Sequence, residues 1–167
     1  MQTAPGGGPL AAEVIASAAR LLADIARASK DSWPDAAGVA AQAESLHDRA
    51  APLADLAARA YEQAVSATGG SHEVGRAYAS AAEPPLRMVE AAADVAELAG
   101  VVAHFGDPAM RADAVAAALL AAGSARAAAE LVAVNLTAGA NDERVRRAER
   151  LAEEAARTAE EVRAARE

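Results

Sequence analysis

The chain has 167 residues and a formal net charge of −8 at pH 7; 53% of its residues are hydrophobic but only 2% are aromatic. Charges of both signs are mixed along the sequence, which argues against a nucleic acid or an anionic membrane as partner. The absence of cysteine excludes disulfides, thiolate catalysis and thiolate metal sites. No run approaches the roughly 20 apolar residues of a membrane span. The first residues lack the order of a signal peptide, so we expect a cytoplasmic protein.

Alanine supplies most of the hydrophobic fraction, and alanine is the best helix former. An alanine face lets helices approach closely, but each contact removes little surface from water, at roughly 25 cal/mol per Å². Such a bundle gains stability when its buried area extends across a subunit interface. We therefore predict one all-α domain over residues 1–167, a bundle of about five long helices that forms a homodimer.

Helical periodicity predicts these elements in chain order: residues 9–30, 35–66, 71–105, 108–136 and 142–167. Pro9 suits a first helical turn. Pro52 predicts a kink or break near residues 47–51, and the run Glu83-Pro84-Pro85 bends or restarts the third helix. The fourth helix is the most apolar, and we expect it to be the central one.

Two helix starts carry capping signals. Ser71 is a predicted N-cap, with Glu73 in the first turn. Asn141 or Asp142 is predicted to cap the last helix, whose mixed Arg and Glu residues indicate a solvated outer position.

Three local features are candidates for function. Gly6-Gly7-Gly8 opens directly onto a helix, where backbone N–H groups can bind an anion, although an ordinary entry loop has the same composition. Lys30 is the only lysine, either by chance or because a compact ammonium group is needed. Asp113, six residues after Asp107, either lines a cleft or lies exposed near a helix start.

The three histidines are far apart in the sequence and have no ligand spacing, so no metal is expected. They are His47, His72 and His104.

Taken in order, these features resemble the cyclodeaminase/cyclohydrolase family, which includes the C-terminal domain of formiminotransferase-cyclodeaminase and stand-alone methenyltetrahydrofolate cyclohydrolases. The resemblance covers nearly the whole chain. It lies in residues 4–12 (Ala-Pro-Gly-Gly-Gly-Pro-Leu-Ala-Ala), Lys30 with Trp33, residues 57–61, residues 81–86, Gly106-Asp107-Pro108 with Asp113, and Val134-Asn135-Leu136.

The resemblance implies an all-helical, usually dimeric protein with a tetrahydrofolate derivative as substrate and no metal. It implies either a cyclodeaminase, which closes 5-formimino-tetrahydrofolate to the 5,10-methenyl form with release of ammonia, or a cyclohydrolase, which adds water to the methenyl carbon. Asp113 would be the base or an orienting group, and Lys30 the acid or a carboxylate anchor. Gly6-Gly7-Gly8, Asp107 and Asn135 would bind the substrate.

The sequence departs from the family pattern at polar positions. Ala57 replaces the aspartate of the family's Asp-Ala-x-Ala-Phe segment, Asp107 replaces an asparagine, and Ala112 replaces a serine. Leu131 and Ala133 replace polar residues just before the Ile-Asn-Leu segment. The alternative function is therefore a divergent, non-catalytic relative that binds folate or serves as a structural or interaction protein.

Overall fold

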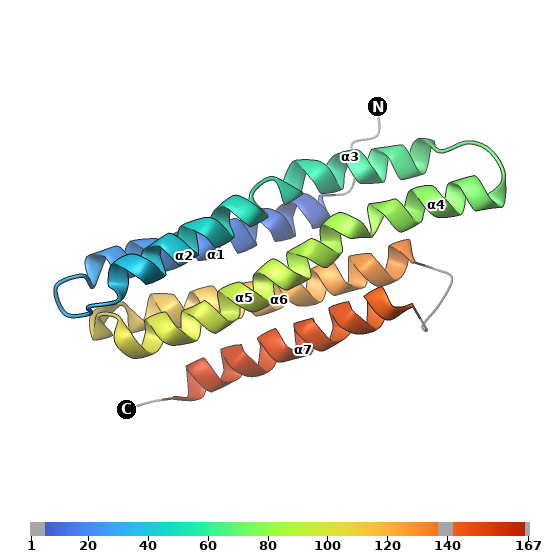
Figure 1. Ribbon diagram of the computed structural model, residues 1–167. Coiled ribbons are helices and arrows are strands. Elements are labelled where there is room, and N and C mark those ends of the chain that lie inside the picture. The colour runs from blue at the N-terminus through green and yellow to red at the C-terminus, as the bar shows by residue number, and fades with distance from the viewer. Residues whose placement is uncertain (1–5, 137–141, 166–167) are drawn as a thin grey trace.

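The computed structural model describes residues 6–136 and 142–165, and within these ranges it contains helices and turns but no strand (Figure 1). This confirms the predicted all-α class. The helices are α1 (Gly7–Ala28), α2 (Ala36–Ala50), α3 (Leu53–Ser66), α4 (Ser71–Ala81), α5 (Glu83–Phe105), the 3₁₀ turn η1 (Pro108–Met110), α6 (Arg111–Asn135) and α7 (Glu143–Ala164).

The helices form five long rods, as the sequence predicts. Helices α2 and α3 make one rod, which is interrupted at Ala51 and Pro52. Helices α4 and α5 make another, which restarts at Glu83 just before the proline pair. Both interruptions lie where proline removes a backbone N–H from the helical ladder. The predicted breaks are therefore confirmed.

The caps agree with the sequence prediction at one helix and differ at another. Asp142 caps α7, because its carboxylate accepts a hydrogen bond of 2.9 Å from the backbone N–H of Arg144. Asn141 lies outside the described residues. The N-cap of α4 is Gly70 rather than Ser71, and the Glu73 carboxylate accepts from the Gly70 N–H at 3.1 Å. The serine therefore starts the helix instead of capping it.

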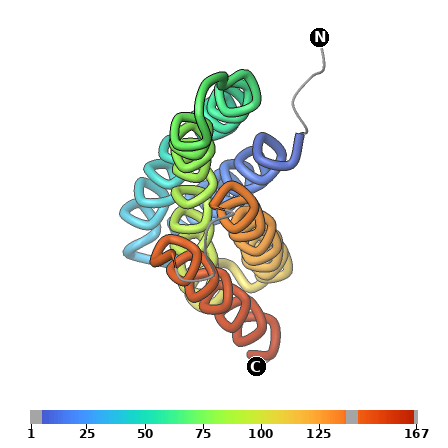
Figure 2. The backbone as a smooth tube through the Cα atoms, turned by 90° about the vertical axis from the view of Figure 1, so that its right-hand side faces the viewer, coloured from blue at the N-terminus to red at the C-terminus, as the bar shows by residue number. Residues whose placement is uncertain are grey.

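The central helix is α5, which packs against each of the other α-helices (Figure 2). The prediction that residues 108–136 form the central helix is wrong, because α6 packs on α1, α5 and α7 and leaves one face exposed. Alanine dominates the core. The largest side chains that are fully buried include Ile15, Leu22, Leu53, Met88 and Val132.

The segment Pro108–Asn135 is long and apolar enough to cross a membrane by length and composition, although half of its most apolar window is buried inside the bundle. The expectation that no segment reaches this length is therefore too strict. A core helix of a water-soluble bundle passes the same test, and the alanine-rich packing face of α6 accounts for the hydropathy.

The rods define two ends of the bundle. At the glycine end, α1 begins with Gly6–Gly8 and α6 finishes at Asn135; at the lysine end, α1 is followed by Lys30 and α6 begins near Asp113 (Figure 1). Helices α1 and α6 run side by side in opposite directions, so the start of α1 lies near the end of α6. The residues of the predicted site belong to the starts and ends of these helices, and each therefore lies near one end of the bundle.

Candidate functional site

The glycine triplet forms the first turn of α1 rather than a loop in front of it. Gly6 is the N-cap, and its carbonyl accepts a hydrogen bond of 3.0 Å from the Leu10 N–H. No side chain caps this helix start. The N–H groups of Gly7 and Gly8 therefore face the end of the helix without an intrahelical partner, at its positive end. This geometry suits an anionic or carbonyl oxygen.

Gly8 is buried where three helices meet. A β-carbon on Gly8 would lie 3.2 Å from Cβ of Ala57 in α3 and 3.7 Å from Cδ1 of Leu131 in α6. The glycine thus permits a close approach of α1 to α3. Segments that are distant in the sequence, those of the glycines, of Ala57 and of Leu131, meet at this point.

Asn135 lies at the same end, one turn beyond Leu131. Its amide Nδ2 donates to the Leu131 carbonyl at 2.9 Å and to the Ala81 carbonyl at 3.4 Å. A cavity of about 540 Å³ lies beside it. The residues that line this cavity are Gly69, Ser71, Val74, Gly75, Tyr78, Ala79, Asn135, Leu136, Asp142 and Arg144.

At the lysine end, the Ser29 hydroxyl ties the turn after α1 to the turn before α6. Its side chain is buried, donates to the Ile25 carbonyl at 2.9 Å and accepts from the Asp107 N–H at 2.8 Å. Trp33 and Phe105 stack beside it, with ring centroids 6.0 Å apart. Lys30 follows Ser29 directly and is exposed.

The two aspartates at this end have different surroundings. The Asp107 carboxylate caps η1 by accepting a hydrogen bond of 2.9 Å from the Ala109 N–H. Asp113 is exposed in the first turn of α6, which agrees with the second of its two interpretations. Gly106 lies in the turn between α5 and η1. It has a structural reason to be glycine, because a β-carbon there would lie 2.6 Å from the Val102 carbonyl oxygen.

The structure brings the predicted site residues together in two groups and not in one. Gly6–Gly8 and Asn135 lie at the glycine end, while Lys30, Asp107 and Asp113 lie at the lysine end. The 22 residues of α1 separate the two groups, which is about 33 Å at 1.5 Å per residue.

A sequence profile of the formiminotransferase-cyclodeaminase family matches residues 1–157. The chain belongs to this family. Its fold is also that of the crystal structure of formiminotetrahydrofolate cyclodeaminase from Thermotoga maritima, with a TM-score of 0.82 and 22% sequence identity over 96% of this chain and 85% of that one. Among curated protein sequences, none matches this chain.

The buried side of the glycine turn packs against two apolar side chains. Ala57 and Leu131, which replace polar residues of the family pattern, are the two side chains in contact with Gly8. Ala57 is only 8% exposed, so a carboxylate at this position would lie buried against the start of α1. These two departures from the family pattern therefore lie beside the glycine turn and not on a remote surface.

One ion pair at this end was not predicted from the sequence. Arg144 donates to Asp142 through both its backbone and its guanidinium, at 2.9 Å each, and these hydrogen bonds lower the pKa of Asp142 to about 2. The same hydrogen bonds raise the pKa of Arg144. Both residues line the cavity beside Asn135. The sequence signal was an Asp-x-Arg spacing at a helix start, which is common at ordinary caps.

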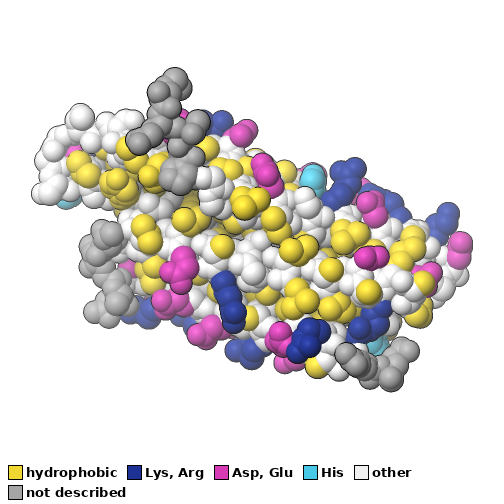
Figure 3. Space-filling view, turned by 180° about the vertical axis from the view of Figure 1, so that it is seen from behind, with side chains coloured by type: hydrophobic (Ala, Val, Ile, Leu, Met, Phe, Trp, Pro, Cys, Tyr) yellow, Lys and Arg dark blue, Asp and Glu magenta, His cyan; other side chains and the backbone are white. Residues whose placement is uncertain are grey.

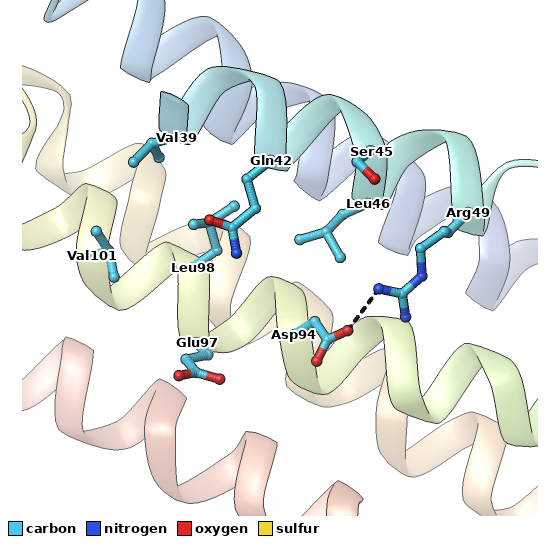
Figure 4. A pocket seen from close by; sticks show the side chains of 9 residues that line it. All are labelled: Val39, Gln42, Ser45, Leu46, Arg49, Asp94, Glu97, Leu98 and Val101. Atoms are coloured by element: carbon cyan, nitrogen blue, oxygen red, sulfur yellow. Dashed lines mark hydrogen bonds and ion pairs between the residues drawn. The ribbon is translucent and has the colours of Figure 1, made fainter. Parts of the chain in front are cut away.

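A second hollow lies between α2 and α5 (Figure 4). It has a volume of about 340 Å³ and is bridged by a hydrogen-bonded ion pair between Arg49 and Asp94 at 2.9 Å. None of the predicted site residues lines it. Both partners are about half exposed, so this ion pair contributes little to stability.

The described residues contain no group of three His, Asp or Glu side chains arranged to hold a metal ion. His47 has a structural contact instead, because its Nδ1 lies 3.0 Å from the Ala16 carbonyl oxygen and links α2 to α1. Nothing in this geometry assigns a catalytic role to the histidine.

Proposed function

We propose that this protein is a folate enzyme of one-carbon metabolism, either a methenyltetrahydrofolate cyclohydrolase or a formimidoyltetrahydrofolate cyclodeaminase. The observation that carries the proposal is the family match over residues 1–157, which includes the glycine turn at the start of α1. The crystal structure that shares the fold is described as a formiminotetrahydrofolate cyclodeaminase, which supports a folate substrate.

Both reactions move protons at a one-carbon unit held between two folate nitrogens. In ring closure, one nitrogen attacks the formimino carbon and loses its proton, and the formimino nitrogen leaves as ammonia after gaining a proton. In hydrolysis, water adds to the methenyl carbon, one carbon–nitrogen bond breaks and a proton is released. A positioned acid and a positioned base supply these transfers.

The residues of the two ends fit these roles by chemical type. Asp113 is exposed and can accept a proton or orient the attacking group. Lys30 is exposed and can donate a proton or hold a carboxylate of the folate tail. The N–H groups of Gly7 and Gly8 would bind an anionic or carbonyl oxygen, and Asn135 and Asp107 would contribute further hydrogen bonds.

A second candidate function is a non-catalytic relative that binds folate or acts as a structural or interaction protein. The observation in its favour is the apolar contact of Gly8 with Ala57 and Leu131, where the family pattern has polar residues. A site that has lost these groups retains the shape of the glycine turn but loses hydrogen bonds to a substrate.

The experiment that separates the two functions follows the near-ultraviolet absorbance of 5,10-methenyl-tetrahydrofolate with and without protein. We expect the protein to accelerate the decay and Asp113→Asn to abolish the acceleration. Asp48→Asn, at an exposed position in α2, is the control and should keep full activity. If the protein does not change the decay, the release of ammonia from the formimino substrate is measured with and without protein. No turnover of either substrate would favour the non-catalytic relative.

We also propose that the protein is a cytoplasmic homodimer. The support for the dimer is energetic, because a core built mainly of alanine buries little area per contact, while α6 leaves large apolar side chains at its surface. Light scattering of the purified chain measures its mass directly, and a monomer at micromolar concentration would contradict the proposal.

A further inference from the structure

The cavity beside Asn135 offers a ligand several polar groups besides that amide. It borders α4, where the pair of helices α3 and α4 projects beyond the end of α6 and the start of α7 (Figure 1). Figure 3 shows this projecting end from behind, as the narrow extension at the upper left. Helix α4 packs mainly against α3, and Ala81 is its only buried residue. The face of α4 that is turned towards α6 therefore borders open space.

Gly75 keeps this space open. It lies near the middle of α4 and lines the cavity. A β-carbon at Gly75 would meet nothing within 4 Å, so packing within the chain does not require a glycine there. A glycine in a helix interior costs about 1 kcal/mol relative to alanine. A longer side chain at this position would occupy the cavity, which gives the glycine a reason that packing does not.

Two side chains hold the wall opposite α4 in place. The Asn135 amide donates to the Ala81 carbonyl at 3.4 Å, and the Arg144 guanidinium donates to the Ala79 carbonyl at 3.4 Å. Both acceptors belong to the last turn of α4, where carbonyl groups lack partners within the helix. The end of α6 and the start of α7 are thereby fixed to α4, so the shape of the cavity is set by the chain itself.

The polar groups that remain for a ligand are mainly hydrogen-bond acceptors. The Asn135 amide turns its Nδ2 to two main-chain carbonyls, so Oδ1 is the atom that it can offer to a ligand. The Asp142 carboxylate stays ionised, because its hydrogen bonds to Arg144 hold its pKa at about 2. A carboxylate has more acceptor sites than these bonds use. The hydroxyls of Ser71 and Tyr78 also line the cavity and can accept or donate.

The charges around the cavity disfavour an anion as its ligand. Arg144 is the one cation among the lining residues that the structure describes, and it is already paired with Asp142 and Glu83. On the other side, the Glu73 carboxylate lies against Gly69. Three carboxylates thus surround one guanidinium, and their field favours a neutral or cationic ligand that donates hydrogen bonds.

The rest of the lining is apolar and includes an aromatic ring. Val74, Ala79 and Leu136 supply the apolar surface, and Tyr78 supplies the ring. The volume of about 540 Å³ lies within the range of about 300–1,000 Å³ that is usual for small-molecule sites. The ligand that fits this lining is a flat ring system with a row of N–H donors along one edge.

We propose that this cavity binds a 2-amino-4-oxopyrimidine ring, which lies over Gly75 and Tyr78 and directs its amino group and its ring N–H at Asn135 and Asp142. The pterin head of a folate and the base guanine both contain this ring. The choice of the pterin rests on the proposed folate function, and the ring site itself does not. The site contributes binding contacts and supplies neither the acid nor the base of the reaction.

The first test fills the cavity and measures tetrahydrofolate binding by equilibrium dialysis. Gly75→Leu should weaken binding about tenfold or more, with unchanged helical circular dichroism because nothing lies within 4 Å of the β-carbon. Gly38→Leu is the matched control, since Gly38 is also an exposed helical glycine with open space at its β-carbon. It should bind as the wild type does. A folded Gly75→Leu protein with wild-type affinity would overturn the proposal.

The second test changes the ligand and leaves the protein as it is. Lumazine carries a carbonyl oxygen where pterin carries the amino group, and the two share the same ring system. In the cavity this oxygen would face the acceptors of Asn135 and Asp142, so pterin should displace tetrahydrofolate about tenfold more strongly than lumazine does. Equal displacement, or stronger displacement by lumazine, would contradict a site that reads N–H donors.

The third test locates the ligand on the protein. Because the chain has no cysteine, Gly75→Cys places a single thiol in the cavity. Saturating pterin should slow the alkylation of this thiol by iodoacetamide, while the rate for Gly38→Cys should not change. An unchanged rate for Gly75→Cys, in a protein that binds pterin, would place the ring elsewhere and overturn the proposal.

Guanosine separates the ring site from the proposed folate function. Binding of guanosine that is lost in Gly75→Leu, together with no binding of tetrahydrofolate, would overturn the folate function and leave the ring site standing with guanine as its ligand. Folate turnover with the same KM in Gly75→Leu as in the wild type would instead support the folate function and overturn the ring site. Binding of neither compound would overturn both.

Discussion

Gly8 and Ala57 touch so closely that a β-carbon on the glycine would lie 3.2 Å from Cβ of the alanine. This contact joins the start of α1 to α3. It also gives the third position of the triplet a packing reason to be glycine that the second lacks, since a β-carbon at Gly7 would meet nothing within 4 Å. The three glycines are therefore not equivalent, and substitutions at Gly7 and Gly8 should change the free energy of unfolding by different amounts.

Gly8→Leu should destabilise the protein, and Gly7→Leu should not. A larger side chain at Gly8 would push against Ala57 and Leu131, and overpacking of this kind costs about 1–3 kcal/mol. At Gly7 the same change adds an exposed side chain with a better helix propensity. Urea unfolding followed by circular dichroism measures the two free energies of unfolding, and equal values for both variants would disprove the difference.

Ala57→Asp should be tolerated better than an aspartate at an ordinary buried position of the same helix. Ala57 lies beside the first turn of α1, whose N–H groups can donate to a carboxylate and so compensate for part of its burial. Ala64, 1% exposed in α3, is the control, because Ala64→Asp buries a carboxylate away from the glycine turn. Thermal unfolding gives the melting temperatures of the two variants, and the value for Ala57→Asp should be the higher one.

The Ala57→Asp variant also tests whether a polar group at this position contributes to catalysis. If the loss of a polar group at Ala57 limits the reaction, Ala57→Asp should raise the turnover of 5,10-methenyl-tetrahydrofolate above that of the wild type. An increase would support an enzyme whose site has diverged. A stable Ala57→Asp protein with unchanged turnover would show that this position has no part in the chemistry.

Ser29→Ala should loosen the turn that carries Asp107. The Ser29 hydroxyl is the acceptor for the Asp107 N–H at 2.8 Å, and its loss leaves that half-buried donor without this partner. An unsatisfied donor of this kind costs about 1–3 kcal/mol. Ser45→Ala, at an exposed position in α2, removes a hydroxyl without this effect. Amide hydrogen exchange at Asp107 should be faster in the first variant only, and equal rates would rule out the anchoring role.

The arrangement of the helices could be predicted from the sequence because proline and glycine mark the ends of the rods. Pro52 and the pair Pro84-Pro85 divide two rods at the places where the structure breaks them. The position of α6 could not be predicted in this way, since high hydropathy does not distinguish a helix buried on all sides from one with a second apolar face. That distinction depends on α5, which occupies the centre.

The candidate site was predicted as a set of residues but not as an arrangement. Periodicity places Gly8 and Asp113 on helices, yet only the direction of the rods shows that they lie at opposite ends of the bundle. Contacts such as that between Ser29 and Asp107 join residues 78 positions apart. A single sequence has no signal for such pairs, because a serine hydroxyl can bond to many backbone groups.

Asp142 should make the stability of α7 depend on pH in the acid range. The Arg144 guanidinium and backbone N–H hold the pKa of Asp142 at about 2, below the ordinary value of 3.8. A carboxyl group with a lowered pKa in the folded state contributes stability that is present above 3.8 and is lost as the pH falls towards 2. Asp142→Ala should therefore lower the melting temperature at neutral pH, and the difference from the wild type should shrink between pH 4 and pH 2. Asp142→Asn, which keeps the capping oxygen but loses the charge, should lie between the two at pH 7. A difference that stays constant down to pH 2 would mean that the charge of Asp142 does not stabilise the start of α7.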